Sequence, residues 1–160
     1  MADLRDLLVT LGYTDVKTHL QSGNALFTSY KANPARLESE IERAFHDTLG
    51  LTVRCLVRSG SDLKAVIAGN PLRTEATDGS RMLALFLSRA PDPKLLAAFD
   101  PRTLEPDKIH LGERVVYQWC PQGILAAPNV GAFVEKHLKV AVTNRNWNTV
   151  TRLGAMLEEA

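Results

Sequence analysis

The spacing of apolar and polar positions divides the chain into short helices and strands. Leu4, Leu7, Leu8 and Leu11 recur at intervals of three and four, which predicts a helix with one apolar face. The same spacing, together with residues typical of helix caps, recurs along the rest of the chain. Helices are therefore predicted over residues 4–11, 34–49, 59–67, 93–99, 129–138 and 143–157.

Short runs of β-forming residues, separated by turn residues, predict the strands. Gly23-Asn24 and Gly112-Glu113 each stand between two such runs, which is typical of tight hairpins. The predicted strands are residues 17–21, 25–28, 53–57, 82–88, 108–111 and 115–119.

The order of these elements is similar in the two halves of the chain. The first half is expected to run α, β, β, α, β and the second β, α, β, β, α, with extra helices appended. A βαββαβ unit forms an antiparallel sheet backed by two helices, and the first half would match it if one more strand preceded residue 1. The predicted fold class is therefore α+β, with two ferredoxin-like halves at 1–71 and 72–160 and the first strand of the first half missing from this chain.

Composition and charge limit the classes of function. The 160 residues are 45% hydrophobic and 23% charged, as in ordinary globular proteins. A net charge of +1 gives no overall field that would attract nucleic acid or anionic lipid. No apolar run has the length of a membrane span or a signal peptide, so a cytoplasmic location without membrane contact is expected. Cys55 and Cys120 are expected to remain unpaired thiols there.

Motifs with established chemistry are absent from the sequence. It has no glycine-rich phosphate loop, no Gly-x-Ser-x-Gly elbow and no His-Glu-x-x-His pair. Ser61 and Lys64 have the spacing of a nucleophile and its base, but chance and helix capping explain such a pair better. No catalytic residue, cofactor or metal ligand is therefore predicted, and whether the protein is an enzyme stays open.

Two polar segments are the candidate ligand-binding residues. Gln21, Ser22 and Asn24 lie at a predicted hairpin tip, and the second segment is Thr143–Thr149. Amide side chains, a guanidinium and free N–H groups at a helix start suit an anion or the edge of a base. The alternative is an elaborate N-cap made by Thr143 or Asn144, with Trp147 directed into the core. In the second segment the candidates are Asn144, Arg145, Asn146 and Asn148.

The same segments carry a family resemblance. The blocks Gln21-Ser-Gly-Asn-Ala-Leu-Phe27 and Thr143-Asn-Arg-Asn-Trp-Asn-Thr-Val150 resemble the bacterial domain of unknown function 1697. The resemblance implies a small cytoplasmic bacterial protein with two ferredoxin-like halves and no established activity. Family members usually begin about twenty residues earlier, with a strand and a glycine-containing loop. A start codon assigned too late, a trimmed chain or a true deletion would each account for the difference.

Three hypotheses about function follow. The first is a non-catalytic module that binds an anionic small molecule or nucleic acid; four basic residues stand against one acidic residue between positions 130 and 152. The second is an enzyme with a non-covalent site assembled from dispersed residues, including Arg145 and Asn146. The third is an interaction protein that forms a homodimer through an exposed sheet edge.

Overall fold

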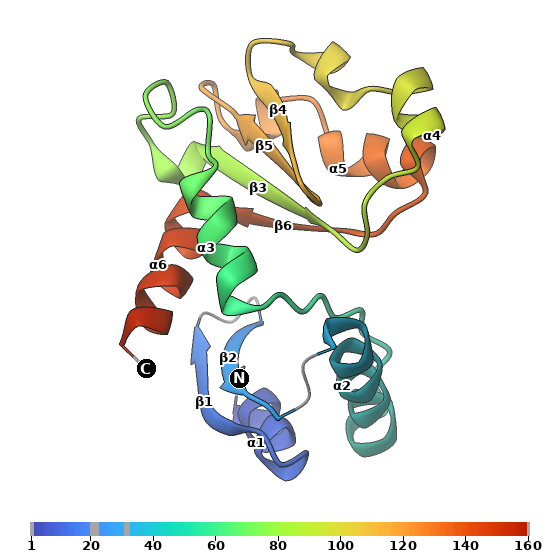
Figure 1. Ribbon diagram of the computed structural model, residues 1–160, viewed down its shortest axis with the longest axis vertical. Helices are drawn as coiled ribbons and strands as arrows, with labels where there is room; N and C mark the ends of the chain where they lie inside the picture. Colours follow the sequence, from blue (N-terminus) through green and yellow to red (C-terminus); the bar gives the residue numbers. More distant parts are fainter. Residues whose placement is uncertain (1, 20–22, 31–32, 160) are drawn as a thin grey trace. The chain divides into compact units, whose positions relative to one another are not determined.

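The computed structural model describes residues 2–19, 23–30 and 33–159. These residues form helices and two antiparallel sheets, so the predicted α+β class is confirmed (Figure 1). The chain divides into two compact units. The first unit comprises residues 1–61 and 153–160, and the second comprises residues 62–152. The predicted division at 71/72 into independent domains stays a prediction.

A hairpin and two helices make up most of the first unit. Its elements are α1 (Ala2–Thr10), β1 (Thr14–His19), β2 (Asn24–Thr28) and α2 (Pro34–Leu49). Asn33 caps α2, because its side-chain oxygen accepts hydrogen bonds from the N–H groups of Ala35 and Arg36 at 3.0 and 3.4 Å. Gly50 ends α2 in the left-handed conformation, with φ of 65°, as the sequence predicts.

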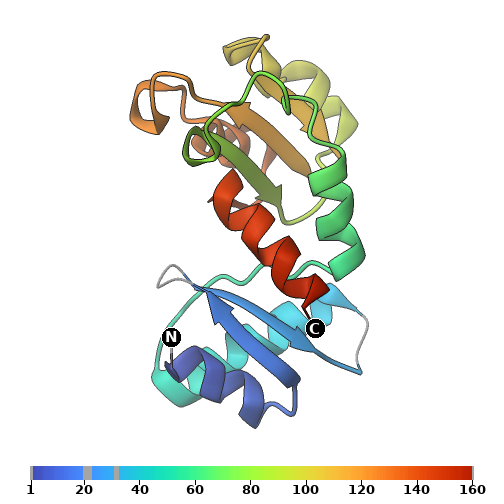
Figure 2. The same ribbon diagram turned by 90° about the vertical axis from the view of Figure 1, so that its left-hand side faces the viewer.

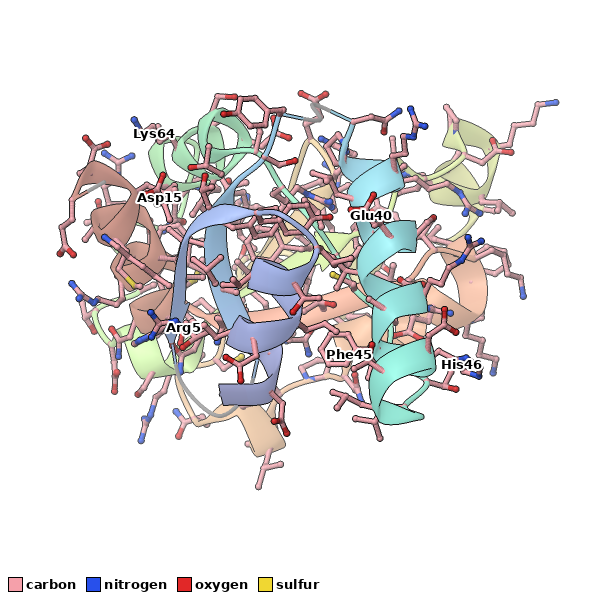
Figure 3. All side chains as sticks on the ribbon, turned by 90° about the horizontal axis from the view of Figure 1, so that it is seen from below. Arg5, Asp15, Glu40, Phe45, His46 and Lys64 are labelled. Carbon is pink, nitrogen blue, oxygen red and sulfur yellow. The ribbon has the colours of Figure 1, made fainter. Side chains whose placement is uncertain are left out.

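Both helices pack on the same side of the hairpin (Figure 2). The core of this unit contains Leu8 of α1, Tyr13, and Leu37 and Ile41 of α2, all at most 6% exposed. Tyr13 stacks on Phe27 and donates a hydrogen bond of 2.8 Å from its hydroxyl to the carboxylate of Glu40. On α2, Glu40 and Phe45 lie toward this core, whereas His46 points away from it (Figure 3).

The predicted strand 53–57 is not a strand in the structure. The segment belongs to neither sheet, and two of its N–H groups bond to side chains of α2. Cys55 N–H donates to Glu42 Oε1 and Val57 N–H donates to Glu38 Oε1, both at 2.9 Å. Its residues are typical of strands, but a strand needs a neighbouring strand, and none of the described residues provides one.

The second unit is built on a four-stranded antiparallel sheet with the order β4-β5-β3-β6. Its strands are β3 (Met82–Leu87), β4 (Ile109–Gly112), β5 (Val115–Trp119) and β6 (Val142–Asn146). Helices α4 (Pro93–Ala98) and α5 (Val130–Phe133) connect the strands, and α5 continues into the π-helical turn η4 (Val134–Leu138). Three single turns are η1 (Gly79–Arg81), η2 (Pro101–Leu104) and η3 (Ile124–Ala126).

The division between the two units falls within two further helices of the chain. These are α3 (Gly60–Ala68) and α6 (Trp147–Glu158). Within the second unit, the strand β3 is buried on both faces of its sheet. Leu83, Leu85 and Leu87 pack with α5 and η4 on one face, while Met82 and Ala84 pack with Val66 of α3 and Val150 of α6 on the other. The second unit therefore has a core on each side of the sheet (Figure 1).

Two details of the second unit differ from the predictions. Residues 143–146 belong to strand β6 instead of opening the last helix, because they pair antiparallel with β3. The β4–β5 turn consists of Glu113 and Arg114, with Gly112 paired to Val115 in the ladder. Arg114 has φ of 54° and donates a hydrogen bond of 3.1 Å to Asp62.

Candidate functional site

The candidate site is built on β6, which forms one edge of the four-stranded sheet. Side chains of successive strand residues point to opposite faces, and residues paired across a ladder share a face. Asn144 pairs with Leu85 and Asn146 with Leu83, so both asparagines lie on the face covered by α5. Arg145 pairs with Ala84 and lies on the other face.

Asn144 lies beside the start of α5. A Cβ placed on Gly131 would be 3.5 Å from Oδ1 of Asn144 and 3.7 Å from Oδ1 of Asn129, so these two side chains flank the buried glycine. Asn129 caps α5, since its Oδ1 accepts a hydrogen bond of 3.0 Å from the N–H of Ala132. Asn144 is exposed, and no atom in the described part of the chain hydrogen-bonds to its side-chain amide. We call Asn129, Asn144 and Asn146 the amide patch.

Two polar residues fix the geometry of the amide patch. Gln118, which is 1% exposed, donates from Nε2 to the carbonyl oxygen of Pro128 at 3.0 Å and so holds the residue before Asn129. Asn146 caps α6, because its Oδ1 accepts a hydrogen bond of 2.9 Å from the N–H of Thr149. The predicted cap at Thr143 or Asn144 is therefore wrong by two or three residues, whereas a capping role for this polar segment is confirmed.

Two other residues of the segment Thr143–Thr149, Asn148 and Trp147, pack against different parts of the second unit. Asn148, on α6, packs against η1, where its Cγ would stand 2.9 Å from a Cβ placed on Gly79. Trp147 packs against the core formed with α3 and is tilted against Tyr117, their ring centroids 6.3 Å apart. The predicted inward direction of the indole is thus confirmed.

The hairpin-tip candidates belong to the other unit. Asn24 begins β2, is 6% exposed, and donates from Nδ2 to the carbonyl oxygen of His19 at 3.0 Å, which closes the hairpin. Gln21 and Ser22 lie outside the described residues. A ligand role for these three residues stays a prediction.

Arg145 supplies positive charge at the edge of the sheet. It is half-buried, and its guanidinium donates a hydrogen bond of 2.7 Å to the carbonyl oxygen of Asn144. Burial lowers the pKa of Arg145 from its usual value, although an arginine remains charged at neutral pH. The cation is therefore anchored to the backbone of the residue that carries the exposed amide.

A short row of rings, which the sequence did not indicate, follows the start of α5. His137 of η4 stacks on Phe99 with centroids 4.6 Å apart and lies tilted against Phe133 at 4.7 Å. Phe99 is 39% exposed. Exposed rings of this kind can stack on a base, although packing between α4 and η4 accounts for the contact equally well.

Groups with strong nucleophilic or metal-binding character are not gathered in the described residues. They contain no cluster of three or more His, Cys, Asp or Glu side chains placed to hold a metal ion. Both cysteines are unpaired thiols, as predicted. Burial, and then the carboxylates of Glu38 and Glu42, raises the pKa of Cys55 to about 12, while burial raises that of Cys120 to about 11. Such thiols are protonated and unreactive at neutral pH.

The comparison with protein families agrees with the resemblance seen in the sequence. Residues 1–117 match the family described as "Protein of unknown function (DUF1697)". The chain belongs to this family. The part matched to DUF1697 includes the block Gln21–Phe27 and ends before Thr143–Val150. No curated protein and no solved structure matches the chain. No helix among the described residues of this DUF1697 chain is long and apolar enough to cross a bilayer.

Proposed function

We propose that this chain is a cytoplasmic, non-catalytic module that binds an anionic small molecule or nucleic acid at the amide patch. The observation that carries the proposal is the placement of Asn144. Its amide is exposed, has no hydrogen-bond partner among the described residues, and flanks the buried Gly131 together with Asn129. The two unpaired thiols support a reducing compartment.

The chemistry of the amide patch favours a ligand with both donor and acceptor atoms. A side-chain amide offers two N–H donors and one oxygen acceptor in a plane, which matches the edge of a nucleobase. The start of α5 contributes a partial positive charge beside Asn144. The guanidinium of Arg145 belongs to the opposite face, but its hydrogen bond to the carbonyl oxygen of Asn144 holds it at the same edge strand. A nucleotide, free or within a single strand, combines a base edge with a negative charge and fits this arrangement best.

The test compares probes of increasing complexity in thermal unfolding. The probes are inorganic phosphate, adenosine monophosphate and a single-stranded DNA of ten nucleotides. A ligand at a hundred times its dissociation constant stabilises the native state by about 2.7 kcal/mol, which raises the midpoint measurably. We expect the nucleotide or the oligonucleotide to raise it and phosphate alone to raise it less.

Asn144→Ala and Thr143→Val form a matched pair for this test, since the two residues are neighbours on β6 and point to opposite faces. Asn144→Ala is expected to abolish the ligand-dependent rise, and Thr143→Val to retain it. If no probe stabilises the native chain, or if both variants respond like the native chain, the amide patch is not a binding site.

We also propose that the two units are ferredoxin-like halves. The second unit supports this with the element order β3, α4, β4, β5, α5, β6 and the strand order β4-β5-β3-β6, in which all neighbouring strands are antiparallel. The first unit supports it with α1, β1, β2 and α2 followed by the extended segment 53–57. An experimental structure in which residues 53–57 pair with β1 would contradict the proposal.

A further inference from the structure

The helix formed by α5 and η4 ends in a turn of unusual geometry. The amide patch lies at the start of α5, and at the opposite end of the helix Val134–Leu138 form a π-helical turn. Lys139 ends this turn in the left-handed conformation, with φ of 59°. Glycine is the usual residue at such a position, and π-helical turns occur often at functional sites. The chain therefore keeps a long basic side chain where it strains the backbone.

Two rings are stacked beside this turn. Phe99, which follows α4, lies nearly parallel to His137 of η4, with an interplanar angle of 17° and ring centroids 4.6 Å apart. The helices α4 and η4 cover the same face of the sheet, because Leu95 packs against the core that contains Leu138 (Figure 1). Phe99 nevertheless remains 39% exposed. The stack thus holds an aromatic ring in a fixed plane at the surface.

Two lysines and an arginine belong to the same turn or contact it. Lys136 is part of η4 and Lys139 follows it, while Arg89 donates a hydrogen bond of 2.8 Å from Nη2 to the carbonyl oxygen of Lys139. All three residues are exposed, and none forms an ion pair within the described part of the chain. Other basic residues of the second unit do pair with a carboxylate, including Arg81, Arg102, Lys108 and Arg114.

The acidic residues of these segments compensate the positive charge only in part. Asp92 caps α4 by accepting a hydrogen bond of 2.9 Å from the N–H of Lys94, and Asp100 is paired with Arg102 at 2.6 Å. Within η4 the one carboxylate is that of Glu135. An excess of positive charge beside an exposed ring is the combination by which proteins bind single-stranded nucleic acid, since its phosphates are accessible and its bases are free to stack.

We propose that the second unit binds single-stranded nucleic acid through one surface, the ring surface, which is formed by Phe99, His137, Arg89, Lys136 and Lys139. A base stacks on the exposed part of Phe99, and the phosphates beside it contact the basic side chains at the end of η4. A strand fits this surface better than a free nucleotide, because the bases and phosphates of a strand engage the ring and several cations together. The ring surface is separate from the amide patch, so the inference does not rest on the function proposed there.

A purely structural role for Lys139 leads to a different expectation. Basic side chains at the C-terminal end of a helix also stabilise it through the helix dipole. Lys139→Gly removes the charge but places the residue that prefers a left-handed backbone. If Lys139 binds phosphate, this variant keeps or raises the melting temperature and weakens binding. If Lys139 serves only the helix, the variant lowers the melting temperature and leaves binding intact.

The experiment measures binding of the full chain to a fluorescent single-stranded oligothymidylate by anisotropy at several salt concentrations. For single strands each phosphate contact contributes about 0.7 to the slope of log affinity against log salt, so Lys139→Gly should reduce that slope by about 0.7. Phe99→Leu should weaken binding at least about fivefold through the loss of stacking. The matched controls are Arg73→Gln, which also removes one exposed positive charge, and Leu125→Ala, which also alters an exposed apolar side chain. Neither control should change the affinity by more than about twofold.

Three results would overturn the inference. One is absence of binding at low salt, and another is equal binding of an oligomer of the same length that has no bases, because stacking would then contribute nothing. The third is native affinity and salt dependence in both Phe99→Leu and Lys139→Gly.

The two proposed surfaces have separate variants, so their failures can be told apart. Weaker binding in Phe99→Leu and Lys139→Gly, with native melting temperatures or higher in Lys139→Gly, supports the ring surface whether or not the amide patch binds a nucleotide. Weaker oligonucleotide binding in Asn144→Ala alone would assign the strand to the amide patch and overturn the ring surface.

Discussion

Replacing Asn146 by alanine should destabilise the protein, whereas the same change at Asn144, two residues earlier on the same face, should not. The Oδ1 atom of Asn146 accepts a hydrogen bond of 2.9 Å from the N–H of Thr149, and Thr149 is 6% exposed. Loss of an N-cap costs about 1 kcal/mol, and a buried N–H left without a partner costs about 1–3 kcal/mol. Because the two terms overlap, we expect Asn146→Ala to lower the free energy of unfolding by about 1–2 kcal/mol.

The matched changes separate capping from binding. Asn144→Ala removes an exposed amide with no hydrogen-bond partner among the described residues, so its effect should stay within about 0.5 kcal/mol. Asn146→Asp keeps an oxygen at the start of α6 and should restore most of the lost stability. Urea unfolding followed by circular dichroism measures all three. Equal losses at positions 144 and 146, or no recovery with aspartate, would refute the assignment of Asn146 as the cap.

Three further predictions concern other parts of the structure. Trp147→Ala should lower the free energy of unfolding by about 3 kcal/mol in urea unfolding, since the partly buried indole packs on the core beside Tyr117; a loss below about 1 kcal/mol would contradict this packing. Gly112→Ala should cost about 1–3 kcal/mol, because its Cβ would lie 2.7 Å from Val115, and a neutral result would argue against the β4–β5 register. Folding raises the pKa of Cys55 from 9.0 to about 12, so the thiol stabilises the native state fully below pH 9 and this contribution disappears as the pH rises toward 12. The stability difference between native chain and Cys55→Ala, measured by urea unfolding from pH 8 to 11, should therefore shrink with pH, and a constant difference would contradict burial of the thiol.

The parts of the fold that follow from local sequence were predicted well. The helix α2 has an asparagine cap, a proline in its first turn and a glycine after its last residue, and each signal acts within a few residues. Strand β3 could be identified from its continuous apolar run. These elements need no information from distant residues.

The errors arose where distant pairing decides the structure. Residues 53–57 have the sequence of a strand, but whether a segment joins a sheet depends on the strand beside it. Residues 143–146 look like a helix start because Asn and Thr are frequent caps, yet pairing with β3 extends them. Local propensity could not distinguish a polar edge strand from an elaborate cap.

The candidate site was predicted only in part for the same reason. Asn144 and Asn146 stand out within a run of three asparagines, but only the sheet shows that both share a face and that Arg145 does not. In the sequence, Asn129 can be recognised only as the cap of a helix. Its position beside Asn144 depends on the packing of α5 against β6, which no spacing along the chain reveals.

The most direct test of the central claim is an NMR titration of the labelled chain with adenosine monophosphate. The side-chain NH₂ signals of Asn144 and Asn129 and the backbone N–H of Gly131 report on the amide patch, and the NH₂ signal of Asn148 serves as a reference on α6. The account predicts saturable shifts at Asn144, Asn129 and Gly131, with Asn148 unchanged. Shifts confined to other parts of the chain, or none at millimolar nucleotide, would contradict it.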